Sequence, residues 1–188
     1  MPQPLILASG SPRRLELLQQ IGVACEVVPA DIDETPLDGE TATELVQRLA
    51  VSKAQRVAQQ HPKRLILAAD TVVYLPGSPD KLFGKPSGRQ DALNTLSQLS
   101  GRTHRVVTGM ALRDGDNIRR KVVHTEVTFA VISSAEQEAY WQSGEPAGKA
   151  GAYAIQGLGA KFVVSLRGSY SNVVGLPLHE TSVWLTQV

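Results

Sequence analysis

The 188-residue sequence predicts an α/β or α+β fold in which helices pack on a long mixed sheet. Its first half alternates short apolar runs with amphipathic stretches, a pattern typical of strands that alternate with helices. Its second half holds long stretches of alternating apolar and polar residues around a glycine turn, which predicts antiparallel strands. No repeat and no linker interrupts the chain, so we expect a single domain over residues 1–188.

Composition narrows the class of protein. Apolar residues make up 42% of the chain, which is enough for a packed core and too many for disorder. The 19 basic and 18 acidic residues give a net charge of +1, without the basic stripe of a nucleic-acid groove. The single cysteine, Cys25, excludes an intrachain disulfide. With no signal peptide and no membrane-length apolar run, we expect a cytoplasmic protein without nucleic-acid or membrane partners.

The first half contains four predicted strands and three predicted helices. Apolar runs place the strands at residues 5–8, 23–29, 65–75 and 81–86, with a turn at 76–80 before the last of them. Ser11 and Pro12 suit the start of a helix that ends at Gly22. Thr41 and Glu44 have capping-box spacing and open a second helix, which ends near residue 61. A third helix is expected over residues 87–99.

The second half is mostly strand. Residues 103–113 and 118–132 flank a turn at 114–117 and predict a hairpin. Alternation places one set of side chains on a buried face, namely Val123, Thr125, Val127, Phe129 and Val131. Ser133 and Glu136 open another helix, which ends at Gly144. A glycine-rich segment follows at 148–159, then a strand at 161–166 and a short terminal helix around 183–185.

Residues 9–14, with the sequence SGSPRR, lie between the first strand and the first helix. Arg13 and Arg14 fall in the first helical turn, where the helix dipole disfavours cations. Free backbone N–H groups, the hydroxyls of Ser9 and Ser11 and two guanidinium groups together would bind a phosphate well. The alternative is a capped helix with two solvated arginines. The complete hexapeptide at a strand-to-helix junction favours the phosphate site.

Asp70 interrupts the most apolar run of the chain. An ionised carboxylate in such surroundings is costly unless it is paired, hydrogen-bonded or bound to a metal. Asp70 could instead end the strand and cap a turn, but the apolar residues continue after it. We therefore expect a kink in a central strand, with Asp70 as a metal ligand or a general base.

Lys53 falls within the apolar stripe of the second helix, four residues after Leu49 and four before Val57. Alone, this position would favour a lysine whose ammonium reaches past the helix edge into water. Beside Asp70 and the arginine loop, it favours a lysine directed into a cleft.

Four further residues are weaker candidates. Lys85 and Lys149 each follow a glycine, and each could equally be a solvated turn lysine. Glu34 could join Asp70 in holding a divalent cation, although acidic loops are more often simply solvated. The amide of Gln156 offers a donor and an acceptor, which suits a pyrimidine edge; bracing of the backbone is the alternative.

The chain resembles the Maf family of nucleotide pyrophosphatases. The matching segments occur in family order over nearly the whole chain: 9–14 (SGSPRR), 31–34 (DIDE), Lys53, 69–73 (ADTVV), 84–86 (GKP), 100–104 (SGRTH), 149–157 (KAGAYAIQG) and 168–177 (GSYSNVVGLP). The resemblance implies an elongated α/β fold, similar to inosine triphosphatases, with the site in a cleft between two lobes. It also implies cleavage of nucleoside triphosphates to a monophosphate and pyrophosphate.

The resemblance further implies roles for individual residues. Asp70 matches the general base, and Arg13, Thr71 and Gln156 match positions tied to substrate choice. The Gln156 loop resembles the branch that acts on dTTP and UTP, with modified pyrimidine nucleotides left open. A divalent cation, Mg²⁺ or Mn²⁺, is implied, and a homodimer is compatible with the family. Two rival readings are a nucleotide-sensing regulator of cell division that cleaves nothing and a phosphatase that releases orthophosphate.

Overall fold

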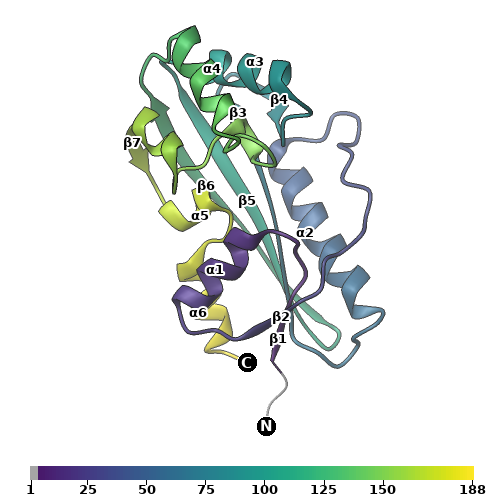
Figure 1. The fold of residues 1–188 in the computed structure, drawn as a ribbon. Helices are drawn as coiled ribbons and strands as arrows, with labels where there is room; N and C mark the ends of the chain where they lie inside the picture. Colours follow the sequence, from purple (N-terminus) through teal and green to yellow (C-terminus); the bar gives the residue numbers. More distant parts are fainter. Residues whose placement is uncertain (1–3) are drawn as a thin grey trace.

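The computed structural model describes residues 4–188, except for the side chains of residues 79 and 80. Within this part of the chain, seven strands form one mixed sheet in the order β2-β1-β3-β5-β6-β7, with β4 paired to β3 (Figure 1). β1 pairs in parallel with β2 and β3, and the remaining pairs are antiparallel. The strands are β1 (Leu5–Leu7), β2 (Cys25–Val27), β3 (Ile66–Leu75), β4 (Ser78–Phe83), β5 (Thr103–Asp114), β6 (Asn117–Phe129) and β7 (Val163–Arg167).

Helices pack on the sheet, as the sequence predicts, and they cover both of its faces. α2 (Ala42–Ala58) lies along one face against β3 and β5. The other helices are α1 (Pro12–Gln20), α3 (Arg89–Leu99), α4 (Ser134–Gln142), α5 (Tyr170–Val174) and α6 (Leu178–Leu185). In Figure 1, α1, α5 and α6 gather near the two termini, and α3 and α4 lie at the opposite end. None of the helices in the described residues has the length and apolar character needed to cross a bilayer.

Side chains of β3 alternate between the hydrophobic clusters on the two faces of the sheet, because successive residues of a strand point to opposite faces. One set packs against α2 and consists of Ile66, Ala68, Val72 and Tyr74. The other set packs into the larger core, with residues of α1, α3 and α4, and consists of Leu67, Ala69, Val73 and Leu75. β3 is therefore buried on both faces along most of its length.

One edge of β3 is open in the middle. β1 pairs with it only at Ile66 and Leu67, and β4 pairs with it only from Val73 onward. The opposite edge is paired with β5 without interruption from Ile66 to Tyr74. Asp70 and Thr71 lie at the open part of the edge, with their side chains directed to opposite faces. The expected cleft lies here, between the end of the molecule that contains β1 and the end that contains β4.

Several local predictions are confirmed. Both capping boxes form, one at Thr41 and Glu44 and the other at Ser133 and Glu136. Pro12 occupies the start of α1. These signals depend on neighbouring residues only, so the sequence carries them in full.

Four predictions are wrong. β3 does not kink at Asp70, because Asp70 pairs with Gly109 in unbroken register and the open edge already admits the carboxylate. The turn predicted at 76–80 ends earlier, since β4 starts at Ser78. Val131 is 82% exposed because β6 ends at Phe129. Residues 170–174 form the short helix α5, which the sequence did not indicate.

Gly109 of β5 lies directly under α2. A Cβ at this position would lie 2.3 Å from the carbonyl oxygen of Val46 and 2.7 Å from the backbone nitrogen of Gln47. Gly109→Ala must therefore push α2 away from the sheet. We expect a loss of about 3 kcal/mol in the free energy of unfolding, measured by urea denaturation.

Gly88→Ala is the matched control, because no atom lies within 4 Å of a Cβ built there. Its expected effect is about 0.5 kcal/mol or less. Equal stabilities of the two variants would contradict the close packing of α2 on β5.

Candidate active site

A pocket of about 300 Å³ opens at the free part of the β3 edge. Its lining comes from the loop after β1, from α1, α2 and β3, and from segments of the second half of the chain. Ten of the eleven candidate residues line it, and Lys149 does not: the ten are Ser9, Ser11, Arg13, Arg14, Glu34, Lys53, Asp70, Thr71, Lys85 and Gln156. The structure therefore brings together residues that are up to 147 positions apart, from Ser9 to Gln156.

The start of α1 forms one wall. Ser11 occupies the N-cap position, but its side chain makes no capping hydrogen bond. The hydroxyl of Ser9 instead accepts the backbone N–H of Ser11 at 3.2 Å. No acidic residue lies in the first turn of α1, so no carboxylate of that turn neutralises the positive end of the helix dipole at the pocket. This wall suits an anion.

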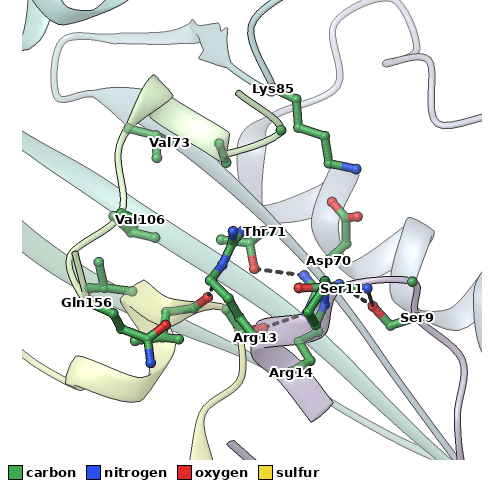
Figure 2. A pocket seen from close by; sticks show the side chains of 18 of the residues that line it. Ser9, Ser11, Arg13, Arg14, Asp70, Thr71, Val73, Lys85, Val106 and Gln156 are labelled. Atoms are coloured by element: carbon green, nitrogen blue, oxygen red, sulfur yellow. Dashed lines mark hydrogen bonds between the residues drawn. The ribbon is translucent and has the colours of Figure 1, made fainter. Parts of the chain in front are cut away.

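Arg14 is buried at the base of this wall and donates three hydrogen bonds. Its Nε donates to the carbonyl of Gly175 at 2.7 Å, its Nη1 to Ser9 Oγ at 3.0 Å and its Nη2 to Thr71 Oγ1 at 3.1 Å. Burial lowers the pKa of the Arg14 guanidinium, and the charge of Asp70 opposes that shift. Arg14 thus joins α1, β3 and the C-terminal segment while adding positive charge to the pocket (Figure 2).

Arg13 also lines the pocket, but it is only half-buried, whereas Arg14 is buried. Its Nε donates to the carbonyl of Val174 at a long distance of 3.4 Å. Burial lowers its pKa, while Glu16 raises it. Lys149, whose role the sequence left open, donates to the carbonyl of Ala147 at 3.2 Å. Burial and, next, the charge of Arg13 lower the pKa of Lys149, so it lies within the electrostatic reach of the site.

Lys53 lies between two carboxylates. Its Nζ is 2.6 Å from Asp70 Oδ1 and 2.6 Å from Glu34 Oε1. The Lys53 side chain is only 7% exposed, which excludes a solvated lysine at the helix edge. Burial raises the pKa of Glu34, but the hydrogen bond and charge of Lys53, with Lys85 and Arg14, outweigh burial and hold that pKa below its usual value.

The remaining two candidates line different parts of the pocket. Lys85 reaches toward Asp70 from the segment after β4, while Gln156 lies on the far side, beyond Arg13 (Figure 2). Apolar side chains line the pocket between them, including Val73 and Val106. The sequence analysis missed these valines. Val73 shares a strand face with Thr71, and Val106 is its cross-strand partner, so the period of two on β3 could have found them.

A second layer supports the lining residues. The hydroxyl of Thr71 is 2.9 Å from that of Thr108, which donates to the carbonyl of Asn172 at 3.2 Å. His104 is fully buried, and its Nε2 is 2.9 Å from the hydroxyl of Tyr153, which lines the pocket. Burial lowers the pKa of His104 to about 3. His104 is therefore neutral near pH 7 and lies behind the lining, so carboxylates remain as the candidate bases.

Known proteins are similar to this chain in sequence over nearly its whole length. A protein from Pseudoalteromonas atlantica named dTTP/UTP pyrophosphatase is 50% identical over 98% of this chain and 96% of its own length. A protein of the same name from Myxococcus xanthus is 54% identical over 94% of this chain and 88% of its own. The structure of the Staphylococcus aureus Ham1 protein is similar at 16% identity and a TM-score of 0.49, covering 68% of this chain and 72% of that one. The family model described as Maf-like protein matches residues 4–188, and this chain therefore belongs to the Maf family.

Proposed function

We propose that this protein hydrolyses dTTP and UTP to the nucleoside monophosphate and pyrophosphate. The observation that carries this proposal is the convergence of Arg13, Arg14, Lys53 and Lys85 with the carboxylate of Asp70 in one pocket. Four cations match the charge of a triphosphate, and a carboxylate beside them supplies a base. The names of relatives at about half identity support the same reaction and the same substrates.

In this proposal the triphosphate lies against the start of α1. The arginines and lysines bind its oxygens, together with the hydroxyls and backbone N–H groups between Ser9 and Ser11. These donors are fixed in place before the substrate arrives, since Arg14 and Ser9 already bond to each other and to the surrounding backbone. Fixed donors stabilise negative charge that develops on phosphate oxygens without a cost of reorganisation during the reaction.

Asp70 acts as the general base. Its carboxylate accepts a proton from a water molecule, whose oxygen forms a bond to the α-phosphorus. The bond from that phosphorus to the oxygen that bridges the α- and β-phosphates breaks, and its electron pair leaves with pyrophosphate. The ammonium of Lys53 holds the Asp70 carboxylate in place.

Asp70 and Glu34 would hold a divalent cation. Their carboxylates fit this role because both already lie within 2.6 Å of one cationic group, the ammonium of Lys53. Among the described residues, no group of three or more His, Cys, Asp or Glu side chains is placed so that it could hold a metal ion. Mg²⁺ is commonly held by one or two carboxylates together with substrate phosphates, which matches this donor set. When bound, the cation would neutralise charge on the phosphate oxygens.

Gln156 contacts the base in this proposal, opposite the phosphate-binding wall. Its amide would pair with donor and acceptor groups on the pyrimidine edge, while Val73 and Val106 contact the apolar ring face. Arg13 and Thr71 line the pocket between the base and the phosphates, and from there they contribute to the choice of substrate.

A regulator that binds nucleotides without cleaving them is the alternative. The phosphate-binding wall suits both functions. Asp70 favours the enzyme, because a carboxylate beside bound phosphates weakens pure anion binding. A single catalytic domain over residues 1–188, a cytoplasmic location and a homodimer are parts of the same proposal.

The first test is product analysis. Incubation of the protein with UTP and Mg²⁺ should release UMP and pyrophosphate in equal amounts, and EDTA should abolish the release. Pyrophosphate is measured by a coupled assay and the nucleotides by chromatography. Orthophosphate as the only inorganic product would identify a phosphatase instead, and bound but intact UTP would identify the regulator.

The second test is Asp70→Asn. Asparagine keeps the volume and an oxygen that accepts from Lys53, so the fold and nucleotide binding should persist. Loss of the base should lower kcat by about 10²–10⁴-fold, measured by steady-state pyrophosphate release. Asp116→Asn in the exposed hairpin turn is the control for charge and should leave kcat unchanged. Near-normal turnover of the Asp70 variant would remove it from the mechanism.

The third test is Gln156→Ala. Loss of the amide should reduce the preference for UTP and dTTP over CTP and GTP, measured as ratios of kcat/KM. The expected change is roughly tenfold, because one hydrogen bond to the base is lost. Gln90→Ala on the exposed side of α3 is the control. Unchanged ratios in the Gln156 variant would exclude it from base recognition.

A further inference from the structure

Glu145 lies just after α4 and binds the loop that carries Gln156. Its Oε1 accepts the hydroxyl of Tyr140 at 2.5 Å and the backbone N–H of Gly159 at 2.9 Å. Its Oε2 accepts the backbone N–H of Leu158 at 2.8 Å. Burial raises the pKa of Glu145, but these three donors and the charge of Lys149 outweigh burial and lower that pKa below its usual value. The carboxylate is therefore charged near pH 7 and holds three donors.

Tyr140 binds the other end of the same loop. Its hydroxyl accepts the backbone N–H of Ala154 at 3.0 Å while it donates to Glu145. Tyr140 is only 2% exposed, and its ring packs edge-on against Phe162 in the core. The loop from Ala154 to Gly159 is thus attached at both ends, to Tyr140 of α4 and to Glu145 just after that helix.

Two glycines make this attachment possible. A Cβ at position 157 would lie 2.0 Å from Glu145 Oε2. A Cβ at position 159 would lie 2.6 Å from the hydroxyl of Tyr140 and 2.7 Å from the carbonyl oxygen of Ala154. Gly157 directly follows Gln156. Gly157 therefore provides room for the Glu145 carboxylate, and Gly159 provides room for the Tyr140 hydroxyl.

We propose that Glu145 is a positioning residue that fixes Gln156 at the base and so sets the selectivity among pyrimidine nucleotides. This inference rests on the proposed function, in which Gln156 contacts the base. Glu145 itself does not line the pocket, so it acts through the loop. The phosphate-binding side chains come from other segments and do not depend on it. Its loss should therefore disturb base recognition more than turnover.

The first experiment measures the attachment directly. Hydrogen exchange of residues 154–159 should be at least about tenfold faster in Glu145→Ala than in the unmodified protein, while exchange in β3 and β5 stays unchanged. Glu145→Gln keeps one accepting oxygen and should give an intermediate rate. Tyr140→Phe removes the hydroxyl but keeps the ring. Unchanged exchange of residues 154–159 in all three variants would overturn the proposal.

The second experiment measures selectivity. In Glu145→Ala the ratio of kcat/KM for UTP over CTP should fall by roughly tenfold, through a higher KM for UTP with kcat within about twofold. Glu145→Gln should restore part of the ratio. Glu138→Ala is the matched control, because Glu138 lies on α4 and pairs with Arg89 and Gln142 at the surface. Faster loop exchange with an unchanged ratio would also overturn the proposal.

A third measurement separates this inference from the proposed function. Calorimetry with α,β-methylene UTP and α,β-methylene CTP gives the binding preference without cleavage. If the unmodified protein binds UTP but releases no pyrophosphate, the proposed hydrolysis fails. The role of Glu145 is then decided by whether Glu145→Ala lowers the binding preference for the UTP analogue.

Discussion

The contact between the Lys53 ammonium and the Asp70 carboxylate is the constraint on which the remainder of the site depends. A charged carboxylate within an apolar central strand is stable only with a partner, and that partner must come from α2. α2 can supply it only by packing closely on the sheet. Gly109 allows this, because any side chain there would meet the helix backbone. The ion pair, the helix packing and the glycine of β5 therefore form one connected requirement.

The open edge of β3 explains how one pocket collects groups from both faces of the sheet. Asp70 points toward α2, while Thr71 points toward α1 and the C-terminal segment, because adjacent strand residues face opposite ways. In a fully paired strand, these two side chains would be separated by the sheet itself. The gap between β1 and β4 lets both reach the same cavity. A short first strand is therefore a condition for the site.

Much of this arrangement could be predicted from the sequence, because its signals are local or chemically unusual. The capping boxes at Thr41 and Ser133 depend on residues three apart, and Asp70 is conspicuous in its apolar run. Features set by distant contacts could not be predicted. Val131 alternates correctly but falls beyond the end of β6, and Glu145 looks like an ordinary solvated loop acid. Only the folded chain places the amides of residues 158 and 159 around its carboxylate.

The hydrogen bond from Arg14 to the carbonyl of Gly175 joins residues 161 positions apart. During synthesis on the ribosome, the N-terminal strand and helix emerge long before this acceptor exists. Until then the Arg14 guanidinium has only the hydroxyls of Ser9 and Thr71 among its three acceptors, and contacts of such long separation form late in folding. A nascent chain therefore cannot assemble the complete site before the segment around Gly175 leaves the exit tunnel.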